Sequence, residues 1–251
     1  MKKGLSLLCS AILAVALFPS GAHGGPPFYT DDSMPILQGQ WELFLASQAA
    51  WTSALRSGTA PHVETNYGAS ADVMIHMITP FAYSQRRGEA ARYGFGDVEL
   101  GFIYRFVRET DGRPEIGIFP HLELPTGSPE RGLGAGMARV FLPVWLMKKW
   151  GAWTAYGGGG YWINPGAGNR DYWSTGLVVK RDLTKALAVG VELFHNSSTR
   201  VDWSSQTAFN VGAILAIGRG RELMISVGRD IHGPGDFAMY VAYHLMLGPD
   251  H

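Results

Sequence analysis

The sequence is poor in cysteine, in charge and in long apolar runs. It has a single cysteine among 251 residues, and only 17% of its residues are charged. Basic and acidic residues number 21 each, so the formal net charge is zero. The chain therefore has no net positive charge to attract the phosphates of a nucleic acid. We therefore expect no nucleic-acid partner. With 33 glycines and 12% aromatic residues, the composition disfavours both a disordered chain and a helix-rich one, and predicts one ordered domain rich in β-structure.

The first 24 residues have the features of a secretory signal peptide. Lys2 and Lys3 precede an apolar run from Leu5 to Phe18, and mostly small residues follow up to Gly24. The run is about 14 residues long, shorter than the roughly 20 that a spanning helix needs, so we expect cleavage near Gly24. Because Cys9 lies inside this run, the mature chain would contain no cysteine. Disulfides and thiol catalysis are thereby excluded.

The other long uncharged stretch, from Trp150 to Asn169, cannot form a membrane helix. It contains seven glycines between residues 151 and 168, together with Pro165. An exported protein without a spanning helix can enter a membrane only as a closed β-barrel.

Polar and apolar residues alternate through much of the mature chain. In 97–107 five apolar side chains share one face, and 115–124 shows the same pattern. Turn signals such as Asn164-Pro165-Gly166 separate the segments and favour antiparallel neighbours. Bacterial barrels have an even number of strands, each of roughly 9 to 11 residues, so ten or twelve strands are expected. About eleven segments qualify: 41–51, 72–79, 97–107, 115–124, 140–148, 152–163, 172–180, 186–194, 209–217, 223–229 and 236–247.

The prediction is an all-β protein: a transmembrane antiparallel β-barrel of about 10 to 12 strands after a cleaved signal peptide. Residues 1–24 are the signal peptide, 25–39 an N-terminal periplasmic segment that plugs or caps the barrel, 40–247 the barrel and 248–251 a C-terminal tail. The polar face mixes glycine, alanine and aromatic residues with isolated charges, which suits a narrow, partly filled interior better than a wet sandwich face.

Tryptophans and prolines add two expectations about the barrel wall. Pro120 and Pro143 lie inside predicted strands, where the missing N–H must fall at a bulge or an edge. Six tryptophans are expected in girdles at the membrane interfaces: Trp41, Trp51, Trp150, Trp153, Trp162 and Trp173.

Several segments resemble a family of exported bacterial proteins, and the similarity covers nearly all of the mature chain. They include PPFYTDD from Pro26, GDVEL from Gly96, FPHLELPTG from Phe119, FLPVWLMKKWGAWTAYGGGGYWIN from Phe141 and ELFH from Glu192. The family is the set of outer-membrane transporters grouped with the "MetA-pathway of phenol degradation" proteins. The resemblance implies a Gram-negative outer-membrane β-barrel that passes small, often aromatic or hydrophobic compounds. It carries over no catalytic residues.

Charged residues on the inward face are the candidates for lining a channel, because charges at a lumen set selectivity at close range. The alternative is that they pair with one another, Arg105 with Glu115 or Glu123 for instance, and only satisfy a filled interior. The candidates are Asp97, Glu99, Arg105, Glu115, His121, Glu123 and Glu192.

The sequence evidence for a metal site or a catalytic site is weaker than that for a channel. His121 and Glu123 share a face, but two ligands are too few for a metal, and we expect no metal and no cofactor. His195 and Ser197 continue an apolar, outward face and resemble the pair of outer-membrane lipid A deacylases, in which the imidazole activates the serine against an acyl ester. No carboxylate has a clear claim to orient His195.

Three functions therefore stay open. The first is a passive channel or transporter for small, hydrophobic or aromatic solutes in the cell outer membrane, with outer-membrane lipid as its surroundings and a solute that the sequence does not name. The others are an acyl hydrolase and a purely structural barrel. The oligomeric state is left undetermined.

Overall fold

The computed structural model describes residues 25–233 and 235–249, so the expected signal peptide lies outside the described residues. The described chain is mostly β-structure, with one short helical turn, η1 (Pro129–Arg131). No helix in this part of the chain is long and apolar enough to cross a membrane. The strands are β1 (Trp41–Trp51), β2 (Leu55–Ser70), β3 (Val73–Arg86), β4 (Arg92–Phe95), β5 (Val98–Val107), β6 (Glu115–Ile118), β7 (His121–Leu124), β8 (Arg139–Trp150), β9 (Trp153–Ile163), β10 (Tyr172–Asp182), β11 (Leu187–Asn196), β12 (Gln206–Gly218), β13 (Arg221–His232) and β14 (Phe237–Leu247).

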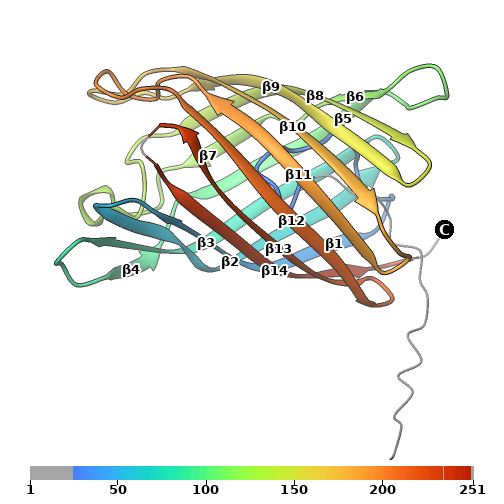
Figure 1. Ribbon diagram of the computed structural model, residues 1–251, viewed down its shortest axis with the longest axis horizontal. Coiled ribbons are helices and arrows are strands. Elements are labelled where there is room, and N and C mark those ends of the chain that lie inside the picture. Colours follow the sequence, from blue (N-terminus) through green and yellow to red (C-terminus); the bar gives the residue numbers. More distant parts are fainter. Residues whose placement is uncertain (1–24, 234, 250–251) are drawn as a thin grey trace, which may run out of the picture.

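These strands form one closed antiparallel barrel (Figure 1). β1 pairs with β14, and the ring closes on the other side where β3 pairs with β5. β6 and β7 are two halves of one interrupted strand, because both pair with β5 and with β8. β4 and β5 pair with successive parts of β3, and Gly96 N–H donates to Pro80 O between them at 2.9 Å, so β4 extends the β5 strand beyond the ring. The ring therefore has twelve strands, the larger of the two expected numbers, and the predicted fold class is confirmed.

β2 is the barrel strand that alternation did not reveal. Its inward side chains are polar, with His62, Glu64 and Asn66 all buried, while Pro61 interrupts the pattern at the other half of the strand. The register shifts between Thr59 and His62, so regular alternation covers only residues 62–67 of this sixteen-residue strand. The barrel interior, and not an apolar core, explains why such a strand is stable here.

The two ends of the barrel differ in their connections. The end where β1 starts and β14 stops carries the turns 71–72, 108–114, 151–152, 183–186 and 219–220. The opposite end carries the connections 52–54 and 87–91 and the longer ones 125–138, 164–171 and 197–205. Outer-membrane barrels have short periplasmic turns and long external loops. We therefore assign the end with the short turns to the periplasm and call the opposite end the outer end.

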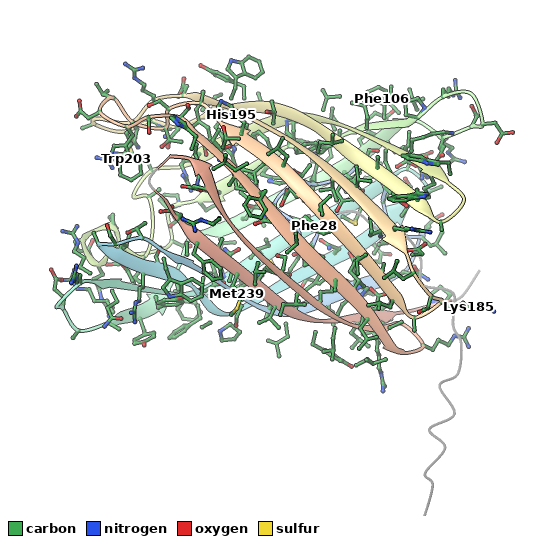
Figure 2. All side chains as sticks on the ribbon, in the orientation of Figure 1. Phe28, Phe106, Lys185, His195, Trp203 and Met239 are labelled. Atoms are coloured by element: carbon green, nitrogen blue, oxygen red, sulfur yellow. The ribbon has the colours of Figure 1, made fainter. Side chains whose placement is uncertain are left out.

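The outer surface of the barrel is apolar. Leu100, Phe102 and Tyr104 on β5 are exposed while Ile103 between them is buried, and Leu142, Val144 and Leu146 repeat the pattern on β8. Large apolar side chains that are exposed on nearly every strand would be unfavourable in water, whereas a lipid bilayer is their natural solvent. Figure 2 shows side chains projecting from all sides of the barrel.

Pro120 and Pro143 lie at the interruption between β6 and β7. Pro120 falls in the gap between β6 and β7. Ile118 pairs with Val144 and His121 with Phe141, so Pro143 on β8 lies across from the same gap without a change of register. The missing N–H groups of two strands are thus gathered at a single place in the sheet.

The expected tryptophan girdles need one correction. Trp41, Trp150 and Trp153 are exposed near the periplasmic end and Trp173 near the outer end, as interfacial residues should be. Trp162 instead points into the barrel and is only 6% exposed. It is one residue out of phase with the outward Tyr161, and strand periodicity alone places it on the inner face.

Candidate functional site: the barrel lumen

Residues 25–39 run inside the barrel, and we call them the lumen segment. Figure 2 labels one of them, Phe28, near the middle of the barrel. Three glycines on adjacent strands make room for them. A Cβ added to Gly190 or Gly212 would lie 2.7 or 3.0 Å from the Phe28 ring, and one added to Gly176 would lie 1.9 Å from Thr30 Oγ1. The segment therefore packs against the wall where the wall has no inward side chains.

Glu192 on β11 holds the backbone of the lumen segment. Its carboxylate accepts the N–H of Tyr29 at 3.1 Å and the N–H of Thr30 at 2.5 Å, and it also accepts Asn210 Nδ2 at 2.5 Å. The side chain is buried, so these three bonds replace its hydration. Bonds to a charged acceptor are stronger than neutral ones, which makes Glu192 the main polar anchor of the segment.

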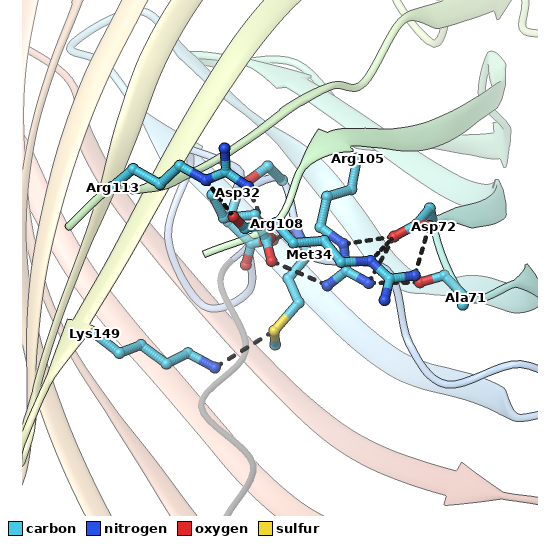
Figure 3. A network of polar contacts seen from close by, with 10 residues as sticks. Asp32, Met34, Ala71, Asp72, Arg105, Arg108, Arg113 and Lys149 are labelled. Atoms are coloured by element: carbon cyan, nitrogen blue, oxygen red, sulfur yellow. Dashed lines mark hydrogen bonds and ion pairs between the residues drawn. The ribbon is translucent and has the colours of Figure 1, made fainter. Parts of the chain in front are cut away.

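A second anchor lies at the periplasmic end (Figure 3). Ser33 Oγ donates to Glu115 at 3.1 Å, and Glu115 in turn pairs with Arg105 at 3.0 Å. Arg105 and Arg108 both bind the carboxylate of Asp72 in the turn between β2 and β3, at 3.0 and 2.7 Å. Arg108, followed by Arg105, lowers the pKa of Asp72 below its usual value. The network links the lumen segment to two periplasmic turns.

Carboxylates and imidazoles form a belt across neighbouring strands of the lumen. His244 lies between Glu222, at 3.1 Å, and Glu42, at 3.0 Å. Asn66 Nδ2 donates to both Glu42 and Glu64, at 2.8 and 2.9 Å. Glu222, His244 and Glu42 lie on β13, β14 and β1, and Glu64 and Asn66 lie on β2. The belt therefore connects four adjacent strands of the barrel.

His76 on β3 continues the belt. Its Nδ1 lies 2.7 Å from Asn66 Oδ1 and its Nε2 lies 3.0 Å from Glu99 Oε1. The Asn66 amide nitrogen already donates to two glutamates, so its oxygen is an acceptor. Both ring nitrogens of His76 therefore lie within hydrogen-bond distance of an oxygen, which fixes the ring between β2 and β5.

The outer half of the lumen holds a cavity of about 720 Å³, the outer cavity. It lies between the lumen segment and the external loop 132–135. A separate space of about 40 Å³ lies beside Asp31, Asp32 and Ile36, and it holds only a few water molecules. Aromatic side chains line the outer cavity: Phe119, Phe141, Trp145, Trp162 and Tyr172. Charged or ionisable side chains also line it: Asp31, Glu64, Asp97, Glu99, Glu123 and Arg139.

The predicted lining residues all lie on the inner side of the barrel but not in one place. Asp97, Glu99, His121 and Glu123 line the outer cavity. Glu192 holds the lumen segment, while Arg105 and Glu115 pair with each other at the periplasmic end. Of the two partners considered for Arg105, Glu115 is the one it contacts, and Glu123 pairs with Arg139.

Similar sequences and similar structures are known for this barrel. A family model described as "Putative MetA-pathway of phenol degradation" matches residues 43–238. The chain belongs to this family. That confirms the resemblance seen in the sequence. None of the curated proteins searched matches the chain.

Solved structures agree on the fold of this family member. The COG4313 outer membrane channel from Pseudomonas putida F1 has a TM-score of 0.75 at 17% identity, over 86% of this chain and 98% of that one. The NanC porin has a TM-score of 0.55 at 8% identity, over 82% and 100% of the two chains. A KdgM porin in complex with oligogalacturonate has a TM-score of 0.54 at 10% identity, over 83% and 99%. At such identities the likeness shows the outer-membrane barrel fold.

The His195 and Ser197 pair of this family member is engaged elsewhere. His195 Nδ1 lies 2.8 Å from Thr207 Oγ1 on the neighbouring strand, and Ser197 Oγ accepts the N–H of Trp173 at 2.9 Å. Among the described residues, no carboxylate forms an ion pair or hydrogen bond with His195. Likewise, no group of three or more potential metal ligands occurs in the described part of the chain.

Sequence reasoning missed β2, and on the predicted segments 72–79 and 236–247 it passed over the inward histidines. His76 and His244 were not recognised because each is a lone histidine on its strand without metal-type spacing, and Glu64 lies on the strand that was not predicted. The spacing of His62, Glu64 and Asn66 at every second position was the available signal. Trp145 stands on an inward position of the predicted segment 140–148, and Arg139 lies one residue before it; counting from Phe141 would have found both.

Proposed function

We propose that this protein is a passive channel or transporter of the cell outer membrane for small solutes, with hydrophobic or aromatic molecules as the favoured class. The observation that carries the proposal is the outer cavity, an aromatic-lined space of about 720 Å³ inside a barrel with an apolar exterior. Ligand sites are usually concave and largely apolar with a few polar groups, and this cavity has that character.

A wide water-filled pore does not fit this lumen. The lumen segment leaves about 40 Å³ beside Asp31 and Asp32. A solute that reaches the outer cavity must therefore displace the lumen segment or leave sideways through the wall. The interruption between β6 and β7 borders the cavity, since Phe119 in the gap and His121 at its edge both line it. These features favour slow passage of small apolar molecules over bulk flow of hydrophilic ones.

Uptake in cells tests transport directly, because the lipopolysaccharide leaflet slows apolar solutes that cross simple bilayers freely. A Gram-negative host that lacks its own porins would take up a labelled aromatic compound faster with this protein than without it. Equal uptake, with the barrel folded in the outer membrane, would leave only the structural role. A lumen role for charge predicts that Glu99→Gln with Glu123→Gln changes the conductance of the purified protein, and unchanged conductance would count against it.

The proposal includes no enzymatic role. His195 and Ser197 each bind another group, and no carboxylate orients the imidazole within the described residues. We therefore expect Ser197→Ala to release as little fatty acid from outer-membrane lipid as the unaltered protein. Hydrolysis that depends on Ser197 would establish the acyl hydrolase instead.

A further inference from the structure

A row of outward side chains crosses five adjacent strands near the outer end of the barrel. Arg229 on β13 pairs with Phe209 on β12 and with Phe237 on β14. Trp51 on β1 pairs with Phe237 and with Arg56 on β2. Paired residues share one face of a sheet, and the exposed rings of Phe209 and Phe237 show that this face is the lipid side. We call these five residues the outer row.

The aromatic members of the outer row mark the level of the outer membrane interface. The ring centroids of Trp51 and Phe237 lie 5.3 Å apart. Aromatic residues gather in girdles where the apolar band of a barrel meets the lipid headgroups. Arg56 and Arg229 flank the aromatic pair, three strand spacings or about 14 Å from each other. Both arginines are exposed, so their long side chains can place the charge among the headgroups.

Two more arginines lie beside Arg56 at the rim of the barrel. The β1–β2 turn and the start of the β3–β4 turn are neighbours at the left of Figure 1, and Arg87 N–H donates to Ala54 O between them at 2.9 Å. A hollow of about 440 Å³ lies between these turns, and Arg56, Arg86 and Arg87 all line it. We call it the rim hollow. Three like charges around one hollow repel one another, and an anion between them offsets the repulsion.

The acidic residues near these arginines are engaged elsewhere. Glu89 pairs with Arg92 at 3.0 Å. Asp230 accepts Gln206 Nε2 at 2.9 Å and two backbone N–H groups of the turn that follows it. Within residues 25–233 and 235–249, no carboxylate forms an ion pair or a side-chain hydrogen bond with the four arginines: Arg56, Arg86, Arg87 and Arg229. The outer surface therefore offers four guanidinium groups to an anion from outside the chain.

We infer that the outer row and the rim hollow bind the phosphorylated headgroup of lipopolysaccharide in the outer leaflet. Guanidinium groups match phosphate with paired hydrogen bonds, and the arginines stand at the level where lipid headgroups lie. Lipid A carries a phosphate at each end of its disaccharide. One phosphate binds at Arg56 and the rim hollow and the other at Arg229, while acyl chains lie along the rings of Trp51 and Phe237.

The arrangement distinguishes lipid A from a phospholipid, because a headgroup with one phosphate reaches only one of the two arginine positions. The site lies on the outside of the barrel and does not involve the lumen. It can therefore be present or absent whether or not the barrel transports a solute.

Lipid titration into barrel refolded in detergent, followed by native mass spectrometry, tests the inference. The probes are bisphosphorylated lipid A, the same lipid with both phosphates removed, phosphatidylglycerol and inorganic phosphate. Bisphosphorylated lipid A should bind about 10- to 100-fold more tightly than the dephosphorylated form, because charge-assisted hydrogen bonds are lost with the phosphates. Equal affinity for these two lipids, phosphatidylglycerol that binds as tightly as lipid A, or displacement of lipid A by an equal concentration of inorganic phosphate would each overturn the inference.

Replacing the arginines of the outer row locates the site. Arg56→Gln with Arg229→Gln should lower the affinity for bisphosphorylated lipid A about 10-fold or more and leave that for the dephosphorylated lipid unchanged. Arg181→Gln is the matched control, because Arg181 is also exposed and lies over a tryptophan, Trp153, at 5.0 Å, but at the periplasmic end. It should change neither affinity. An equal loss in the control, or full affinity in the folded double variant, would refute the assignment.

A second pair of substitutions tests the rim hollow. Arg86→Gln with Arg87→Gln should also weaken bisphosphorylated lipid A and spare the dephosphorylated lipid. Faster gel migration before boiling verifies that each variant is a folded barrel. If the outer-row variant does not fold, the rim variant and the comparison of lipids on the unaltered barrel still decide.

Discussion

Removing the carboxylate of Glu192 should release the lumen segment and open the channel. Two of the three hydrogen bonds to this carboxylate come from the segment's backbone, from Tyr29 at 3.1 Å and Thr30 at 2.5 Å. Hydrogen bonds to a charged group contribute roughly 1.5–3 kcal/mol each, so Glu192→Ala should weaken the bound position by about 3–6 kcal/mol. That corresponds to about two to four powers of ten in the equilibrium between bound and released segment.

Single-channel recording in planar bilayers is the assay. Glu192→Ala should show larger and more frequent openings than the unaltered protein. Asn210→Ala is the matched control, because it removes the third bond to Glu192 and leaves both bonds to the segment. Heat-modifiable gel mobility, with faster migration before boiling, verifies that each variant is a folded barrel.

A reversible lock separates release of the segment from a general loosening of the barrel. The Cβ of Thr30 lies 3.0 Å from a Cβ built on Gly176, so a shift of about 0.5 Å would allow a disulfide between cysteines at these positions. In the Glu192→Ala background, oxidation of Thr30→Cys with Gly176→Cys should abolish the added conductance, and reduction should restore it. Unchanged conductance in folded Glu192→Ala would refute the reasoning that these bonds keep the lumen closed.

Three further outcomes test the assignment of surfaces and ion pairs. Val144→Arg, near the middle of the lipid-facing surface of β8, should lower the free energy of unfolding in bilayers by about 2–4 kcal/mol. Leu247→Arg, at the membrane edge, should lower it by only about 0–1 kcal/mol. Equal losses of stability would contradict the bilayer placement. Arg105→Met leaves the buried Glu115 without its cation and should cost about 3–5 kcal/mol in urea unfolding, against at most about 1 kcal/mol for Arg108→Met on the exposed side of the same network. Because the pKa of Asp72 is lowered from 3.8, its pairing should stabilise the barrel above that pH and be lost as the pH falls through the lowered value; Asp72→Asn should remove this acid-dependent part of the urea midpoint, and an unchanged pH profile would show that the pairing contributes nothing.

The regularity of each strand decided which residues of the lumen could be predicted from the sequence. Glu99, His121 and Glu123 were found because they alternate with large apolar residues on strands of regular pattern. Glu64 escaped because the register of β2 shifts between Thr59 and His62, which interrupts its alternation. His76 escaped because it is a lone histidine among the apolar residues of its strand. Trp162 was placed on the wrong face because its type suggested an interface while its position in the strand pointed inward.

The sequence by itself predicted a signal peptide for export, and it determined that the protein forms a β-barrel with an apolar exterior. Both rest on short-range patterns, since a signal peptide is a local composition and strand faces alternate with a period of two. Only the tertiary structure decided what fills the lumen. The anchor between Tyr29 and Glu192 joins residues 163 positions apart, and closure of the ring brings β3 against β5 and β1 against β14. Such contacts depend on register and closure, which no local pattern encodes.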